Sequence, residues 1–308
     1  MMKGRARNMK FDAYQMVTDR ICEMLEQGFI PWDKPWAMAK TSAWSGCDGR
    51  IYSLLNQFML ADPDKHYKDW DELTQDIAGE WVTYKQAENR GGCVRKGEKG
   101  RKIVFFTMLP EKDKDGKETK HFFPYLKWTT VFKVSQCDGI EQKFHKDADC
   151  LYNFNPNQTA DEVALAYVDR EKIKLKIKKS NKACYSPSSD TVTMPMPEQF
   201  KDSAEYYSTL FHELAHSTGH PKRLNRLVRA AAFGDDDYSA EELVAEISSA
   251  SILYTLGIEN ARTFKNSAAY VQNWLKALKN DKKLIVTASG RAEKAIKMIL
   301  GIVEGGEC

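Results

Sequence analysis

The 308-residue sequence contains no run of 18 apolar residues, which argues against a transmembrane helix. No apolar stretch follows the basic N-terminus, so we expect no secretory signal. The chain also lacks any CxxC pair. Its seven cysteines are odd in number and far apart, which fits neither a disulfide framework nor a zinc-finger framework. Without repeats or low-complexity tracts, the sequence predicts a globular cytoplasmic protein with reduced cysteines and no membrane partner.

Tryptophan is scarce in the second half of the chain, since six of the seven tryptophans precede residue 135. This asymmetry indicates two differently built halves, and 308 residues are enough for two domains with their own cores. The segment between them mixes turn-forming residues without a sustained period. We therefore predict a first domain at 1–135, a linker at 136–159 and a second domain at 160–308.

Apolar periodicity predicts an α+β fold for the whole chain. In the first half, the runs IVFFTMLP and HFFPYLKWTTVFKV are typical of strands joined by a solvated turn. The second half is predicted to be mostly helical with a small sheet, formed by KIKLKIKK and KACYSPSSDTVTMP. Helices are predicted at about 10–27, 50–60, 83–89, 160–170, 203–217, 239–256, 262–278 and 288–303.

The segment YYSTLFHELAHSTGH contains the pattern HExxH. Helical residues four apart lie on one face, so His212 and His216 can reach one ion, and Glu213 can act as general base on a water at that ion. The alternative is a buried helix whose two histidines have no metal. Because the whole chain has only six histidines, a chance pair at this spacing is less expected. Zinc is the expected metal, with another divalent transition metal as the alternative.

A catalytic zinc needs a third protein ligand. The metzincin spacing would place it at Lys222, a cation that cannot serve. The helix YSAEELVAEISSA is a better source, because its Glu242 follows His216 by 26 residues, which allows an antiparallel return. Glu242 and Glu246 share one face, and this spacing resembles the gluzincin pattern, in which the first acid ligates and the second orients a ligating histidine. We therefore favour Glu242 as the third ligand.

Glu246, Glu241 and His220 remain alternatives for the third ligand. Glu241 also fits a solvated acid at the start of a helix. His220 stands between Gly219 and Pro221, where the preceding helix is expected to end. With Glu213 as the base, the second half is predicted to hold a gluzincin-like zinc metallopeptidase site.

The first half contains a dense basic segment, with seven basic and two acidic residues between Lys85 and Lys102. Single-stranded nucleic acid suits it better than duplex, because no recognition-helix motif is visible. The alternative is that the tryptophans are buried in the core and that the basic segment is a solvated hairpin tip. The residues alone therefore do not decide whether this half binds nucleic acid. The cations able to follow a phosphate backbone are Lys85, Arg95, Lys96, Lys99, Arg101 and Lys102. The aromatics able to stack on bases are Trp32, Trp36, Trp44, Trp81, Tyr84 and Phe105.

Taken together, these motifs resemble the ArdC-like antirestriction proteins of plasmids and other mobile genetic elements. In the first half the resemblance rests on FIPWDKPW, on Tyr52 and Asn56 in GRIYSLLNQ, and on WVTYKQAENRGGCVRKGEKG. In the second half it rests on YSPSSDTVTMP, YYSTLFHELAHSTGHPKRLNR, FGD and YSAEELVAEISSA.

The resemblance implies an N-terminal domain that binds single-stranded DNA, a C-terminal zincin-like metallopeptidase domain, and protection of incoming DNA from host restriction during conjugation. It assigns Trp81, Lys85, Gln86, Lys96 and Lys99 to DNA binding. Proteolysis does not follow from it. An active metalloprotease that cleaves a regulatory protein and a non-catalytic DNA-binding protein with a structural metal therefore stay as alternatives, and a host restriction or regulatory protein is a further candidate partner.

Overall fold

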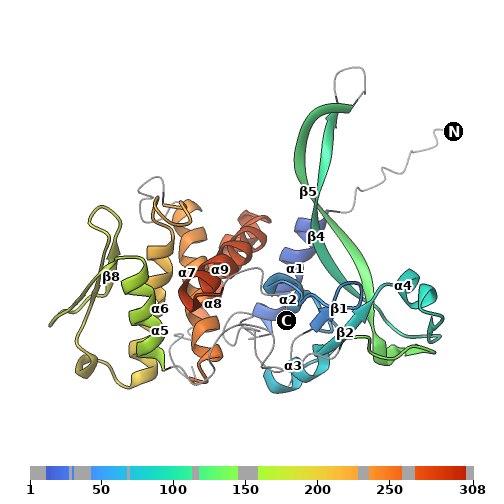
Figure 1. Ribbon diagram of the computed structural model, residues 1–308, viewed down its shortest axis with the longest axis horizontal. Helices are drawn as coiled ribbons and strands as arrows, with labels where there is room; N and C mark the ends of the chain where they lie inside the picture. The colour runs from blue at the N-terminus through green and yellow to red at the C-terminus, as the bar shows by residue number, and fades with distance from the viewer. Residues whose placement is uncertain are drawn as a thin grey trace.

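The computed structural model describes residues 12–27, 30, 43–67, 70–112, 118–144, 159–227, 236–258 and 268–302. These residues form the predicted α+β fold, with the strands of a larger sheet in the first half and mostly helices in the second (Figure 1). None of their helices combines the length and the apolar character that a bilayer crossing requires.

The first half is organised around a sheet with strand order β1-β2-β5-β4, in which β1 and β2 are parallel and the other pairs antiparallel. Thr83 and Gln86 form a capping box at the start of α4, the helix expected at 83–89. The helix expected at 50–60 is shorter, because it begins only after Ser53. The elements are α1 (Ala13–Glu26), β1 (Ala43–Ser45), α2 (Leu54–Met59), α3 (Trp70–Ile77), β2 (Gly79–Val82), α4 (Tyr84–Asn89), β3 (Cys93–Val94), β4 (Arg101–Lys112), β5 (Glu118–Lys133) and β6 (Cys137–Asp138).

The two long strands β4 and β5 form a twisted ribbon that projects from the body of the molecule (Figure 1). Their register pairs Arg101 with Val131 at the base and Lys112 with Glu118 near the tip. The two predicted strands are confirmed as an antiparallel pair, and residues 113–117 of the predicted turn lie outside the described residues. Near the base of the ribbon, α2 is joined to β4 by Asn56, whose amide bonds both the N–H and the C=O of Val104.

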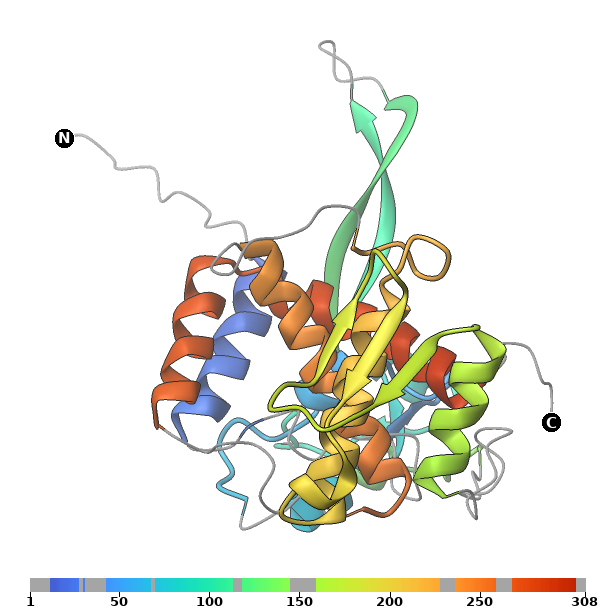
Figure 2. The ribbon, with the colours of Figure 1, turned by 90° about the vertical axis from the view of Figure 1, so that its left-hand side faces the viewer.

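The second half contains helices beside a small sheet of order β7-β9-β8, in which β7 and β9 are parallel and β8 and β9 antiparallel. Figure 2 shows this sheet in front of the helices. Its edge strand β8 lies against α6. The elements are α5 (Ala160–Arg170), β7 (Lys174–Ile177), β8 (Cys184–Ser186), β9 (Thr191–Met194), α6 (Ser203–Thr218), α7 (Asp236–Thr255), α8 (Ala268–Asn280) and α9 (Leu284–Leu300).

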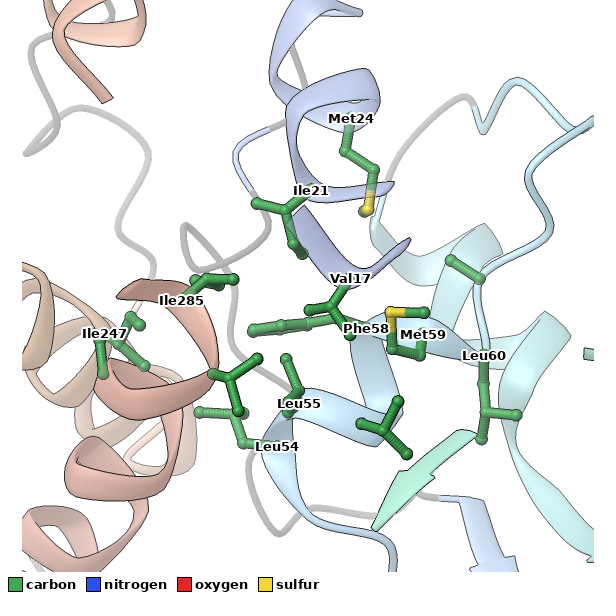
Figure 3. Packing of buried hydrophobic residues seen from close by; sticks show 14 of the residues in the cluster. Val17, Ile21, Met24, Leu54, Leu55, Phe58, Met59, Leu60, Ile247 and Ile285 are labelled. Carbon is green, nitrogen blue, oxygen red and sulfur yellow. The ribbon is translucent and has the colours of Figure 1, made fainter. Parts of the chain in front are cut away.

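A hydrophobic core joins the two halves of the sequence. Apolar residues of α1 and α2, such as Val17, Ile21 and Phe58, pack with Ile247 of α7 and Ile285 of α9 (Figure 3). Burial of this many apolar side chains in one cluster is strongly stabilising. The first half therefore depends on helices that lie more than 100 residues further along the chain.

A second core lies wholly in the second half, where Tyr167, Val192 and Phe211 are fully buried with parts of α7 and α9. Both of these helices contribute to both cores. In α9, for example, Ile285 belongs to the first core and Ile296 to the second. A helix that is apolar on more than one face is expected to be buried between layers. α7 and α9 are thus the shared wall between the two halves.

Candidate metal centre

The HExxH pattern lies on α6, close to the end of that helix. The side chain of Asp202 caps its N-terminus by accepting a hydrogen bond from the Glu205 N–H, and Leu210 and Leu214 bury one face in the second core. Since His212 and His216 are one turn apart, both rings lie on the opposite side. Their Nε2 atoms are 3.1 Å apart, and the rings meet edge to face.

Glu242 on α7 completes a cluster with these two histidines. One of its carboxylate oxygens lies 3.6 Å from Nε2 of His212, and the other lies 3.5 Å from Nε2 of His216. Ligands at 2.0–2.2 Å around a tetrahedral ion are themselves about 3.4 Å apart. The three potential ligand atoms, all within 4.8 Å of one another, therefore fit a single metal ion of zinc size.

Glu241, the preceding residue, contacts the other nitrogen of His216. Its carboxylate lies 3.5 Å from Nδ1 and accepts two hydrogen bonds from Arg226, at 2.7 and 3.0 Å. Arg226 also donates to Thr218 Oγ1 at the end of α6. Burial alone would raise the pKa of Glu241, but His216 and Arg226 lower it, so the carboxylate is ionised. The interpretation of Glu241 as a solvated acid at the helix start was wrong, because its side chain is buried by this network.

Glu213 is buried beside the cluster. Desolvation raises the pKa of its carboxyl group, against the charges of His216 and His212 and a hydrogen bond from the backbone N–H of Tyr185. A carboxylate with a raised pKa is a better proton acceptor near neutral pH. This environment matches what a general base needs.

Burial alone would lower the pKa of His212, but the hydrogen bond with Glu242 and the charges of Glu246 and Glu213 raise it to about 9. The negative charge of Glu246 therefore acts on His212 although Glu246 is not part of the three-residue cluster. His220 lies outside that cluster too, and its Nδ1 accepts a hydrogen bond from the backbone N–H of Lys222.

A buried ion pair fixes the chain that follows α6. The Arg223 side chain is 2% exposed, bonds both oxygens of Asp190 in the β8–β9 turn, and donates to the backbone carbonyl of Ser217 at 2.7 Å. The hydroxyl of Tyr185 donates to the same aspartate at 2.8 Å. This network ties edge strand β8 to the end of α6 and so holds the Tyr185 amide near Glu213. Arg223, Arg226 and the role of Glu241 were not found by motif reasoning.

Two residues predicted to contact DNA, Trp81 and Arg101, already have partners within the first half. Trp81 is 1% exposed and its indole N–H donates to the carbonyl of Ile77, so the prediction of an exposed stacking ring was wrong. Arg101 lies over this ring, 5.3 Å from its centroid, and pairs with Asp76 at 2.6 Å and with Asp62. Its charge is thus already compensated by two carboxylates of the first half, and a contact of Arg101 with a phosphate stays a prediction.

Three further predicted residues, Tyr52, Asn56 and Gln86, line one pocket between the first half and α9. The amides of Asn56 and Gln86 are engaged in bonds to Val104 and Thr83, so both residues build its walls. Burial raises the pKa of Tyr52, which keeps its phenol protonated.

The remaining predicted cations lie on the surface. Lys85 and Lys96 are exposed, Lys99 pairs with Asp64 at 2.7 Å, and Arg95 pairs with Glu98 at 2.8 Å and Asp138 at 3.6 Å. Exposed pairs of this kind are weak and can be exchanged for a phosphate. Trp32 and Trp36 lie outside the described residues.

Comparison with known proteins finds a matching family model for each half of the chain. The family model "N-terminal domain of anti-restriction factor ArdC" matches residues 11–132, and "Zincin-like metallopeptidase" matches residues 162–291. The metal-free crystal structure of the antirestriction ArdC protein from plasmid R388 is 36% identical, with a TM-score of 0.66, over 94% of this chain and 97% of that one. The chain belongs to the ArdC antirestriction family. The Mn(II)-bound structure of the same protein matches with 35% identity and a TM-score of 0.66 over the same shares of both chains.

Curated relatives extend the comparison beyond ArdC. A DNA primase TraC of Escherichia coli is 30% identical over 311 residues, which cover 93% of this chain and 27% of that protein. The chain thus spans about a quarter of the length of this relative. The uncharacterized protein y4eC of Sinorhizobium fredii is 28% identical, over 96% of this chain and 93% of y4eC. The family resemblance stated from the motifs is confirmed.

Proposed function

We propose that this ArdC-family chain binds a divalent metal ion through His212, His216 and Glu242. The convergence of two Nε2 atoms and one carboxylate within 3.1–3.6 Å is the observation that carries the proposal. Zinc is the preferred ion, and another divalent transition metal is the alternative, since the related R388 protein is described with Mn(II). When bound, such a metal acidifies a water and polarises a carbonyl group.

The side chains around the site have separate roles in peptide hydrolysis. Glu213 accepts a proton from the attacking water and later passes it to the leaving amine. Glu241, held by Arg226, accepts a hydrogen bond from the Nδ1–H of His216 and thereby keeps the Nε2 lone pair directed at the ligand cluster. Edge strand β8, beside Glu213, can align an extended peptide by β-addition. The substrate class is therefore a protein segment in extended conformation, such as part of a host restriction or regulatory protein.

In the same proposal, the first half binds single-stranded DNA. The exposed Lys85 and Lys96 supply sequence-independent contacts to phosphates, and exposed aromatics on β4 and β5 offer faces for unstacked bases. Together the two activities protect incoming DNA from host restriction during conjugative transfer, in the cytoplasm of the recipient. We keep the predicted domains 1–135 and 160–308 but extend the first to residue 144, because β6 pairs with β3 and the Lys143 and Phe144 amides donate to Glu80. Of the predicted linker 136–159, residues 145–158 lie outside the described residues, and α7 and α9 connect the two cores.

Metal content and peptidase activity of matched variants test the proposal. Purified wild type is expected to hold one metal ion by mass spectrometry, whereas His212→Ala and His216→Ala lose it. Glu213→Gln is expected to keep the metal, and its rate of peptide hydrolysis should fall at least 100-fold, the usual contribution of a general base. The exposed His66 provides the control, because His66→Ala should leave both readouts unchanged.

Two outcomes separate the competing functions. If Glu213→Gln retains full antirestriction in a transfer assay with unmodified DNA, the metal serves the fold and not peptide hydrolysis. If that variant loses antirestriction but still binds single-stranded DNA, the active protease is the functional form. Loss of metal from Glu213→Gln would overturn the division of roles between base and ligands.

A further inference from the structure

A pocket of about 510 Å³ opens where the first half of the chain meets α9. Its walls come from the segment before and within α2, from the base of the β4–β5 ribbon and from α9. No residue of the metal centre lines it. The volume falls in the range of small-molecule sites. Lining residues that bear on the argument are Tyr52, Phe105, Phe106, Ser289, Gly290 and Glu293.

Ser289 gives the pocket an unsatisfied polar group. The residue is 1% exposed, and its hydroxyl forms no hydrogen bond with any of the described residues. Burial of a hydroxyl without a partner is unfavourable, and such groups in native proteins call for an explanation. The hydroxyl itself is buried, so a ligand in the pocket would satisfy Ser289 only after its side chain turns toward the opening.

Gly290 adds a second and independent observation. Glycine inside a helix destabilises it relative to alanine, and Gly290 lies in the interior of α9. A Cβ at this position would have no described neighbour within 4 Å beyond its own helix, so packing does not require glycine here. The space above Gly290 belongs to the pocket, where a side chain would take room from a ligand.

The border of the pocket is aromatic. Phe105 and Phe106 both line the pocket and are 45% and 55% exposed although they are large apolar side chains. As neighbours on β4 they point to opposite faces of the strand pair, so one of the two rings borders the opening, and Tyr52 lines the same pocket. An exposed ring beside a partly apolar cavity suits a flat heterocycle that can stack on it.

The charges indicate which part of a ligand goes inside. Asp48 and Glu293 line the pocket and would disfavour a phosphate inside it, and the highly exposed Arg50 side chain pairs with Asp48 at 3.5 Å. Lys127 stands opposite Phe105 in the strand register, and Lys85 precedes the lining residue Gln86. An uncharged ring inside the pocket, with its phosphates outside near these cations, satisfies both sets of charges.

We propose that the pocket receives one unstacked base of single-stranded DNA, with Ser289 and Gly290 of α9 as its floor. This inference rests on the proposed binding of single-stranded DNA by the first half and specifies where a base is held. It gives α9 a role in DNA binding although the helix lies in the second half of the sequence. Because α9 also packs along α7, which carries Glu241 and Glu242, a bound base would touch the wall shared with the metal centre.

Substitutions at Gly290 test the pocket in the full-length protein. Gly290→Ala and Gly290→Leu both remove the helix glycine and have similar helix propensity, but only leucine fills the cavity. With a fluorescein-labelled single-stranded oligonucleotide, fluorescence anisotropy is expected to give a Kd within twofold of wild type for Gly290→Ala and at least tenfold weaker for Gly290→Leu. Thr287→Leu, at an exposed position of the same helix, should bind like wild type.

A chemical probe gives a second readout that does not depend on the folding of one variant. An oligonucleotide with abasic sites is expected to bind wild type more weakly, and Gly290→Leu should weaken it no further, because the base that enters the pocket is already missing. Ser289→Ala should weaken binding of the intact strand by several-fold and leave the abasic strand unaffected.

The outcomes separate this inference from the function on which it rests. If wild type binds single strands and Gly290→Leu binds them equally well, the pocket holds no base and only this inference falls. If Gly290→Leu loses affinity for a free mononucleotide but not for the oligonucleotide, the pocket serves a small molecule and the inference is again overturned. If wild type does not bind single strands at all, both the inference and the DNA-binding half of the proposed function fail.

Discussion

Glu241 lies 3.5 Å from Nδ1 of His216, on the side of the imidazole that faces away from the ligand cluster. The next residue on α7, Glu242, lies 3.5 Å from Nε2 of the same ring. Two consecutive glutamates therefore contact the two nitrogens of one histidine. In a neutral imidazole with its N–H at Nδ1, Nε2 carries the lone pair, so the first contact prepares the second nitrogen for a metal.

Removing the charge of Glu241 should weaken metal binding without removing a ligand. Glu241→Gln is expected to lower metal affinity by about 10–100-fold, the usual effect of changing the partner of a ligating histidine. Competition against a fluorescent chelator measures this directly. Glu205→Gln, an exposed acid in the first turn of α6, is the control and should bind metal like wild type. An unchanged affinity in Glu241→Gln would show that His216 is oriented without this carboxylate.

Glu242 is expected to be the third ligand when metal is present. A crystal structure of the metal-bound protein should place one of its oxygens at about 2.0–2.2 Å from the ion, together with both Nε2 atoms. Glu246 and His220 should lie beyond ligand distance, because neither belongs to the three-residue cluster of the described residues. Coordination by either of them in place of Glu242 contradicts this assignment and leaves the HExxH histidines in place.

Much of the metal centre could be predicted from local sequence. The spacing of His212 and His216 fixes their common face on a helix, and Glu242 follows at a distance that permits an antiparallel return. Arg226 could not be predicted, since its contact with Glu241 depends on how the chain turns between α6 and α7. Whether Glu241 or Glu246 faces the histidines depends on how α7 is rotated about its axis. That rotation cannot be read from the sequence, because α7 is apolar on several faces.

The long strands and three helices of the first half were predicted, but α3, the short strands and the packing were not. Apolar periodicity predicted α1 and the long strands, but it does not identify the partner of an apolar face. The packing of Val17 and Ile21 against Ile285 joins segments more than 250 residues apart. For the same reason, composition could not show whether Trp81 faces solvent or the core.

The buried pair of Arg223 and Asp190 should be important for stability. Arg223→Met leaves Asp190 without its cation, and loss of one partner from a buried pair costs about 3–5 kcal/mol. Urea unfolding is expected to report a lower free energy of unfolding by an amount near the lower end of that range, because Asp190 keeps some exposure to solvent. The highly exposed pair of Lys172 and Asp169 is the matched control, and Lys172→Met should change stability by less than about 1 kcal/mol. Equal effects of the two substitutions would contradict a structural role for Arg223.

Glu80 should make the stability of the protein sensitive to acid. Burial would raise the pKa of its carboxyl group, but hydrogen bonds from the Phe144 and Lys143 amides and the ion pair with Arg90 lower it below 4.5. A lowered pKa in the folded state contributes stability that is present above pH 4.5 and lost as the pH falls through the folded-state value. Between pH 7 and pH 3, the Tm of wild type should therefore fall more than that of Glu80→Gln. Parallel pH profiles of the two proteins would exclude Glu80 as a source of this dependence.

Binding of single-stranded DNA should depend strongly on salt, and Lys96 should account for part of that dependence. Each lysine that neutralises a phosphate contributes about 0.7 to the slope of log Kd against log salt concentration, because counterions are released from the strand. Lys96 is exposed, so Lys96→Ala is expected to reduce the slope by about this amount. Lys99 pairs with Asp64 before DNA binds, and Lys99→Ala should therefore weaken binding less, since that contact must first be broken.

Lys172→Ala, on the second half, is the control and should leave the slope unchanged. The measurement is anisotropy with the full-length protein, because the first half shares its core with α7 and α9. A slope that is the same for wild type and Lys96→Ala means that the basic segment lies away from the phosphates.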